Sequence, residues 1–247
     1  MIKLILLRHG ESQWNLENRF TGWKDVSLTN KGIEEATFSG EKLYKMNIKI
    51  GSVYTSILNR AIETTDIVTD IINFPKENIQ CDWRLNERHY GALEGLNKSE
   101  TAKKYGEDQV HIWRRSYDIS PPSLEINDQR HPKLNSKFKN IEGELPVGES
   151  LKDVIDRLQP FWGKYVNHIT KMGGNHLIVA HSNSLRAIIK ILDKLSAEQI
   201  TSVNIPTGVP LVYTLSQKLD TVEKKYLINE TELKEKQALV LNQGKSQ

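Results

Sequence analysis

Apolar residues gather in short runs along this chain, and amphipathic segments separate one run from the next. Runs at residues 2–7, 52–56, 79–83, 177–180 and 211–215 have the length and composition of buried strands. Apolar positions recur at helical spacing over residues 33–46, 60–72, 99–113, 150–172 and 185–195. The alternation predicts an α/β fold, a three-layer α/β/α arrangement with a mostly parallel central sheet and flanking helices.

Two segments depart from this alternation. Residues 120–147 carry Pro, Asn, Lys and Gly with little periodicity, which predicts an inserted irregular segment. From Asn229 onward the chain is rich in Lys and Glu, which predicts a marginal helix and a mobile end. We therefore expect a single domain over residues 1–228 and a flexible charged C-terminal tail over residues 229–247.

Polar residues follow the first strand at the point where it ends. Arg8 and His9 come directly after residues 2–7, where open α/β sheets bind their ligands. A neutral imidazole is a competent nucleophile, and a guanidinium beside it neutralises phosphoryl oxygens. Taken alone, the pair is more often an ordinary strand end with a solvated arginine and a hydrogen-bonded histidine.

Later parts of the chain supply partners for this pair. His181 follows the fourth strand, Arg60 opens the helix after the second, and Glu87 follows the third. If these strands are neighbours, His9 would attack phosphorus and hold it as a phosphohistidine. Arg8, Arg60 and His181 would stabilise the transferring oxygens, since phosphoryl transfer depends on electrostatic stabilisation. Glu87 would exchange the proton of the substrate hydroxyl.

Composition fits an ordinary soluble enzyme, with 38% apolar and 26% charged residues. The sequence has no apolar stretch long enough for a membrane span and no signal peptide, so a cytoplasmic protein without a membrane partner is expected. Its one cysteine excludes an intrachain disulfide and a multi-cysteine metal site.

Charge is uneven along the chain, although the net charge is only +3. Between Arg84 and Arg115, basic residues recur among aromatic ones. This stretch is compatible with a solvated helix face, with an RNA-binding surface, or with a funnel for a small polyanion. A net charge this small does not by itself indicate nucleic acid as the partner.

Seven ordered blocks resemble the cofactor-dependent phosphoglycerate mutases of the histidine phosphatase superfamily. They are residues 7–15 (LRHGESQWN), 20–23 (FTGW), 84–93 (RLNERHYGAL), 95–98 (GLNK), 113–115 (WRR), 181–186 (HSNSLR) and 204–213 (NIPTGVPLVY). The resemblance extends from Ile2 to about Leu227. A lone Arg-His-Gly is only moderately specific, whereas seven blocks in order leave little room for chance.

The resemblance implies a glycolytic and gluconeogenic enzyme that interconverts 3-phosphoglycerate and 2-phosphoglycerate. His9 resembles the phosphorylated nucleophile, Glu87 the proton donor and acceptor, and His181 the transition-state stabiliser. The ligand-binding positions would be Arg8, His9, Ser12, Asn15, Thr21, Gly22, Arg60, Glu87, Tyr90, Lys98, Arg114, Arg115, Ser182 and Asn183. 2,3-Bisphosphoglycerate would prime the histidine without a metal. The family also implies a homo-oligomer, a dimer or a tetramer, and a small phosphoglycerate rather than nucleic acid as the partner.

One position departs from the family pattern. The family has Gly where this chain has Ser182, directly after the second histidine. If that position needs a positive φ or a close backbone approach to phosphate, a Cβ costs about 1 kcal/mol or more. We therefore expect weakened but not abolished mutase turnover.

Two other functions stay open on the sequence. In a phosphatase, water rather than a glycerate hydroxyl would discharge His9. In a non-enzymatic binding protein, Ser182 would have disabled the site. Ser12 favours the mutase over the relatives that mainly synthesise bisphosphoglycerate, which tend to have Gly there. The retained Tyr90, Lys98, Arg114 and Arg115 favour the mutase over a phosphatase.

Overall fold

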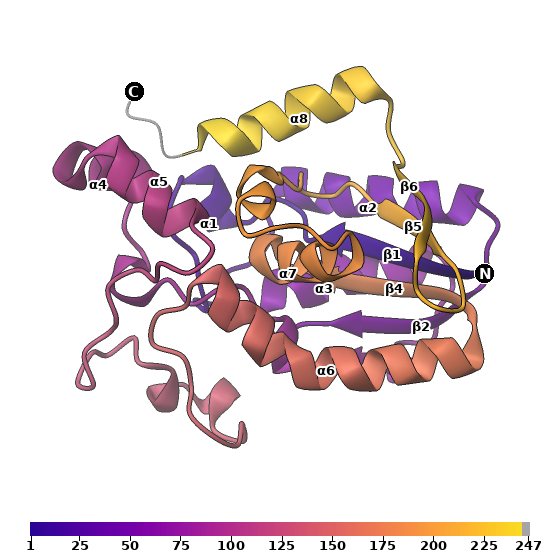
Figure 1. Cartoon of the computed structure of the whole chain (residues 1–247), viewed down its shortest axis with the longest axis horizontal. Coiled ribbons are helices and arrows are strands. Elements are labelled where there is room, and N and C mark those ends of the chain that lie inside the picture. Colours follow the sequence, from indigo (N-terminus) through magenta and orange to yellow (C-terminus); the bar gives the residue numbers. More distant parts are fainter. Residues whose placement is uncertain (244–247) are drawn as a thin grey trace.

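A computed structural model describes residues 1–243 and shows a six-stranded sheet with helices on both faces (Figure 1). The strands are β1 (Ile2–Arg8), β2 (Ile50–Thr55), β3 (Ile79–Cys81), β4 (Gly174–Ala180), β5 (Leu211–Leu215) and β6 (Thr221–Tyr226). The helices are α1 (Gln13–Leu16), α2 (Asn30–Lys45), α3 (Asn59–Ile71), α4 (Lys98–Tyr105), α5 (Glu107–Arg115), α6 (Leu151–Met172), α7 (Ser182–Leu192) and α8 (Glu230–Asn242). The predicted α/β/α class is confirmed.

The strands lie in the order β3-β2-β4-β1-β5-β6. β1 to β4 are parallel to one another, which confirms the mostly parallel sheet. β5 runs antiparallel to β1, and β6 runs antiparallel to β5. The sequence did not predict β6, because this edge strand is almost fully exposed and carries Glu and Lys in place of an apolar pattern.

Successive residues of β1 point to opposite faces of the sheet, as the pleat requires. Leu4 and Leu6 belong to the core that the sheet forms with α6 and α7. Ile5 and Leu7 belong to the core on the other face, together with residues of α2 and α3. Because β1 is buried on both sides, its residues are apolar apart from the half-buried Lys3, until Arg8 ends the strand at the edge of the sheet.

Local side-chain contacts set several element boundaries. Thr29, expected at a helix start, is the N-cap of α2 and accepts a 3.1 Å hydrogen bond from the Gly32 N–H. The predicted strand 79–83 ends early because the Asp82 carboxylate accepts from the Arg84 N–H and starts a 3₁₀ turn, Trp83–Leu85. The predicted helix 99–113 divides into α4 and α5 at Gly106, whose φ of +89° is incompatible with a helix.

The two segments that depart from the α/β alternation differ in their secondary structure. Residues 120–147 contain only two 3₁₀ turns, Pro132–Leu134 and Ser136–Phe138. The segment expected as a flexible tail contains α8, which leaves β6 and runs over the molecule toward α1 and α5 (Figure 1). The last four residues of that tail, 244–247, lie outside the described residues. Within residues 1–243, no helix has both the length and the apolarity needed to cross a membrane.

Candidate active site

The two strand-terminal histidines lie side by side. β1 and β4 pair in parallel with Arg8 opposite Ala180, and the His9 N–H donates to the Ala180 carbonyl at 3.0 Å. The ring centroids of His9 and His181 are 4.9 Å apart. The register of β1 against β4 therefore brings together the two histidines that the sequence placed 172 positions apart.

The tautomer of His9 follows from two contacts. His9 Nδ1 lies 2.6 Å from the Gly10 carbonyl oxygen, which can only accept, so Nδ1 carries the proton. Nε2 is then the basic nitrogen, and Arg60 Nε donates to it at 3.3 Å. The geometry assigns Nε2 as the nucleophilic atom and holds the ring in place.

Burial and nearby cations keep His9 neutral. Its side chain is 2% exposed. Burial first, then the Arg60 and Arg8 guanidinium groups, hold the pKa of His9 well below its usual 6.5. The imidazole is therefore in its nucleophilic form at neutral pH.

We expect the acid limb of kcat/KM that belongs to His9 to lie below pH 6.5, because the free enzyme protonates this ring only under more acidic conditions. The measurement is kcat/KM from about pH 5 to about pH 8, corrected for the second phosphate ionisation of the substrate near pH 6. A corrected limb at or above the ordinary histidine value would contradict the assigned environment.

Arg60 comes from the first turn of α3 and is 1% exposed. It donates to the carbonyls of Gly22, at 2.9 Å, and Lys24, at 3.0 Å, so the loop between α1 and α2 holds it against His9. Gly22 permits this loop with a φ of +54°. Burial lowers the pKa of Arg60 to about 10, which leaves the guanidinium charged at neutral pH.

Two buried nitrogens beside His9 have no hydrogen-bond partner within residues 1–243. They are Arg8 Nε and His181 Nδ1. The other ends of both side chains are held, since Arg8 Nη1 donates to the Ile205 carbonyl and Ser56 Oγ lies 2.7 Å from His181 Nε2. Buried polar atoms are rarely left unpaired. The Arg8 Nε–H, and His181 Nδ1 when it carries the ring proton, are available to donate to an oxyanion, which is compatible with a phosphoryl ligand beside His9.

Glu87 lies beside the start of α7. Its Oε1 accepts from the Arg88 N–H at 2.8 Å, the Asn183 N–H at 3.1 Å and Asn183 Nδ2 at 2.9 Å. Three donors leave no lone pair on Oε1 for a proton. Oε2 is therefore the oxygen of this carboxyl group that is available to carry a proton.

A cavity opens between this edge of the sheet and α8, and its lining is strongly cationic. The lining includes ten of the predicted binding residues: Arg8, Asn15, Thr21, Glu87, Tyr90, Lys98, Arg114, Arg115, Ser182 and Asn183. Arg19 and Arg186 add two further cations, and among residues 1–243 the only carboxylate in the lining is that of Glu87. Burial and the neighbouring Arg114 lower the pKa of Lys98 well below its ordinary value. Such a cavity favours a small ligand with more than one negative charge.

α8 forms one wall of the cavity. Val240 and Gln243 line it, and Arg114 Nη1 donates to the Gln243 carbonyl. Gln237 Nε2 donates to the Asn204 carbonyl at 3.2 Å. The hydrophobic pattern could not predict this position, because α8 buries little more than Val240.

The structure places some predicted residues away from the cavity lining. His9, Arg60 and His181 form the buried cluster described above and are at most 2% exposed. Ser12 is the N-cap of α1, where it exchanges hydrogen bonds with Asn15, and Gly22 positions Arg60 through its carbonyl. Ser12 and Gly22 therefore shape the segment around α1 and the loop that follows it.

The possible backbone strain at Ser182 is not present. Ser182 is the first residue of α7, and it is not among the residues with a positive φ. A Cβ is therefore tolerated by the backbone at this position. Since Ser182 lines the cavity, its side chain still occupies space beside the ligand position.

The sequence did not reveal several residues that support the cluster. Ser56 binds His181, and Arg186 Nη1 donates to Asn183 Oδ1 at 3.0 Å, which turns the Asn183 amide nitrogen toward Glu87. Arg157 and Glu149 contact the Glu87 segment. Arg157 lies within a helix, and Glu149 lies just before its N-cap. Neither residue belongs to a sequence motif that indicates a role in the site.

Comparison with known proteins agrees with this fold. One solved structure with the same fold is mycobacterial glucosyl-3-phosphoglycerate phosphatase, which is 21% identical with a TM-score of 0.67 over 91% of this chain and 96% of that one. Another is alpha-ribazole phosphatase from Shigella flexneri, which is 23% identical with a TM-score of 0.64 over 90% of this chain and 95% of that one. Bacillus stearothermophilus YhfR is 25% identical with a TM-score of 0.64, over 89% and 93% of the two chains. The family description "Histidine phosphatase superfamily (branch 1)" matches residues 4–141 and 123–218. The chain is therefore a phosphoryl-transferring enzyme of branch 1 of the histidine phosphatase superfamily.

Proposed function

We propose that this enzyme is a 2,3-bisphosphoglycerate-dependent phosphoglycerate mutase. The observation that carries the proposal is the cavity lined by Arg8, the chain neighbour of His9, where six cationic side chains accompany the Glu87 carboxylate. A bare phosphate needs only the groups around His9. The cations farther along the lining, on α4 and α5, suit the carboxylate or second phosphate of a glycerate ligand.

In the first step, His9 Nε2 attacks the phosphorus atom and becomes phosphorylated. Arg60 and Arg8 stabilise the equatorial oxygens with charges that are already in place before the reaction. The His181 ring centroid lies 4.9 Å from that of the attacking ring, and its Nδ1 has no hydrogen-bond partner within residues 1–243. The carbonyl of Gly10 stabilises the positive charge that develops on the His9 ring.

Glu87 handles the proton of the substrate oxygen in both steps. As an acid it protonates the oxygen that leaves phosphorus when His9 attacks, and as a base in the second step it removes the proton from the hydroxyl that attacks phosphohistidine. Asn183 and the Arg88 N–H keep Oε1 occupied, so both transfers use Oε2. The same carboxyl group thus serves the forward and the reverse reaction.

The position of α8 supports transfer to a hydroxyl over hydrolysis. A wall over the site reduces the access of water, which would otherwise discharge the phosphohistidine. Val240 and Gln243 close one side of the cavity. A second candidate, a phosphatase, is favoured by the solved structures with this fold that carry phosphatase names. It would use the same residues with water in place of the glycerate hydroxyl.

The test is a coupled assay of 3-phosphoglycerate conversion, with and without 2,3-bisphosphoglycerate, in parallel with release of inorganic phosphate. The mutase predicts isomerisation that depends on the bisphosphate and exceeds phosphate release. Phosphate release that exceeds isomerisation would assign the enzyme as a phosphatase. Absence of both activities would contradict the proposal that phosphoglycerate is the substrate.

Ser182 gives a direct test of crowding in the cavity. We expect Ser182→Gly to raise kcat/KM for phosphoglycerate, because the side chain lines the cavity beside the ligand. Ser182→Ala is the matched control, since it keeps the Cβ and removes the hydroxyl. No gain in kcat/KM with either variant would show that Ser182 does not limit turnover.

A further inference from the structure

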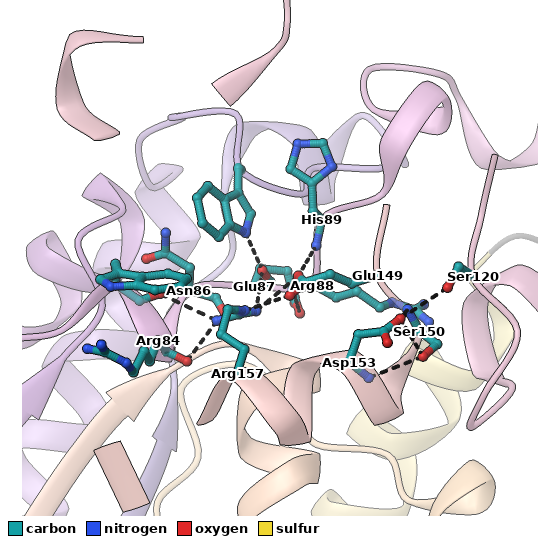
Figure 2. A network of polar contacts seen from close by, with 12 residues as sticks. Arg84, Asn86, Glu87, Arg88, His89, Ser120, Glu149, Ser150, Asp153 and Arg157 are labelled. Carbon is teal, nitrogen blue, oxygen red and sulfur yellow. Dashed lines mark hydrogen bonds and ion pairs between the residues drawn. The ribbon is translucent and has the colours of Figure 1, made fainter. Parts of the chain in front are cut away.

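A buried ion pair lies behind Glu87 and has no part in the chemistry described above. Arg157 of α6 and Glu149, which precedes the N-cap Ser150, join through Nε and Oε1 at 2.6 Å and through Nη2 and Oε2 at 3.1 Å (Figure 2). Their side chains are 6% and 3% exposed. Burying two charges is expensive, and a hydrophobic pair of similar volume often stabilises a protein as well. Stability alone therefore does not account for this pair.

The guanidinium group of Arg157 binds the backbone that carries Glu87. Nη1 donates to the carbonyl of Arg84 at 2.8 Å, and Nη2 approaches the carbonyls of Asn86 and Glu87, each at 3.3 Å (Figure 2). A planar fork of donors can bridge several acceptors at once, which a lysine ammonium cannot do. Arg157 thus fixes the path of the chain up to Glu87.

Glu149 holds the same segment on the other side of Glu87. Its Oε2 accepts from the His89 N–H at 2.7 Å, and its own N–H donates to the His89 carbonyl at 2.9 Å (Figure 2). A third anchor comes from Trp23, whose Nε1 donates to the Glu87 carbonyl at 2.7 Å. The backbone is therefore held both before and after the Glu87 side chain.

We propose that Arg157 and Glu149 are a positioning pair that aligns the Glu87 carboxyl group for proton transfer. The proposal rests on the proposed function, because it takes Glu87 as the proton donor and acceptor. After the turn Trp83–Leu85 the segment through Tyr90 belongs to no helix or strand, so side chains must set its geometry. Displacement of a reacting group by about 1 Å can cost about 10²-fold in rate.

The test compares substrates whose leaving groups differ in their need for a proton. An alkyl phosphate such as phosphoglycerate leaves as an alkoxide unless Glu87 protonates it, whereas p-nitrophenolate leaves unprotonated. The variants are Arg157→Lys, which keeps the charge pair, and the double variant Arg157→Met with Glu149→Leu, which leaves no buried charge unpaired. Rates of His9 phosphorylation are measured with 2,3-bisphosphoglycerate and, from the nitrophenolate burst, with p-nitrophenyl phosphate. Thermal unfolding reports the folded state of each variant.

We expect both variants to lose about 10²-fold with the bisphosphate, as for a misplaced proton donor, and to stay within about threefold with p-nitrophenyl phosphate. In a Glu87→Gln background, Arg157→Lys should cause no further loss with the bisphosphate. Equal losses with both substrates, or no loss with either, would overturn the positioning role.

The matched control is the pair Arg130 and Asp128 on the inserted segment. Arg130 also binds a carboxylate and the backbone carbonyls of Ala92 and Glu94, but it does not line the cavity. The double variant Arg130→Met with Asp128→Leu should not lower the rate of His9 phosphorylation with 2,3-bisphosphoglycerate relative to the rate with p-nitrophenyl phosphate. A wild-type enzyme without a nitrophenolate burst or phosphate on His9 would instead remove the proposed function, and the positioning role with it.

Discussion

Replacement of His9 by alanine is expected to abolish phosphoenzyme formation and to lower kcat by about four to six powers of ten, as for loss of a covalent nucleophile. In the His9 imidazole, Nδ1 donates to the Gly10 carbonyl, and the basic Nε2 lies 3.3 Å from Arg60 Nε, which leaves Nε2 as the nucleophilic nitrogen of the ring. The measurement is acid-labile phosphate on the protein after incubation with 2,3-bisphosphoglycerate, together with kcat for phosphoglycerate.

His168→Ala is the matched control for this variant. His168 is exposed on α6, so its replacement removes an imidazole far from the catalytic edge of the sheet. It should retain full activity and the acid-labile phosphate. Acid-labile phosphate on the His9→Ala protein would show that another residue is the nucleophile.

Glu87→Gln is the change with the second largest expected effect. Glutamine has nearly the same volume and its oxygen can still accept from Asn183, so the fold should be preserved. The proton on Oε2 is lost, and kcat for phosphoglycerate should fall by about 10²–10⁴-fold. The nitrophenolate burst should fall far less, because that leaving group needs no proton. The two rates, measured on one preparation, check the assignment.

Glu94→Gln provides the comparison. Glu94 is another buried carboxyl group near the Trp23 loop, and burial raises its pKa to about 7, but it does not line the cavity. We expect its replacement to leave kcat nearly unchanged. If Glu94→Gln and Glu87→Gln lost the same factor with phosphoglycerate, Glu87 would not be the specific proton donor.

The sequence was sufficient to predict the parts of the site that lie at strand ends. β1 and β4 are buried apolar runs, and a parallel sheet brings the residues after such strands to one edge. His9 and His181 follow from this rule, and so does Arg60 at the start of the helix after β2. The predicted fold class follows from the same alternation of strands and helices.

The parts that the sequence did not predict depend on long-range packing. Arg157 lies on the polar side of a helix pattern, and only the tertiary structure shows that it meets the carbonyls of the Glu87 segment. α8 has too weak an apolar face to reveal its docking position, and β6 is an exposed edge strand. The helical φ of Ser182 likewise became clear only from the start of α7.

The balance between mutase and phosphatase depends on which acceptor reaches the phosphohistidine. In the proposed mutase, the cationic lining would contact a glycerate carboxylate and phosphate, and Val240 and Gln243 form one wall of the cavity. Both functions pass through the same phosphorylation of His9, so the first half of the reaction cannot distinguish them. The two functions differ in the acceptor, a glycerate hydroxyl or water, to which the phosphoryl group passes from His9.

The most direct test is therefore a chase of the labelled phosphoenzyme. The protein is labelled on His9 with radioactive 2,3-bisphosphoglycerate, separated from the label, and mixed with either 3-phosphoglycerate or buffer alone. We predict rapid loss of the label into bisphosphoglycerate with 3-phosphoglycerate, and slow loss into inorganic phosphate with buffer. Label that never appears on His9, or that passes to inorganic phosphate at the same rate in both cases, would contradict the proposed mutase.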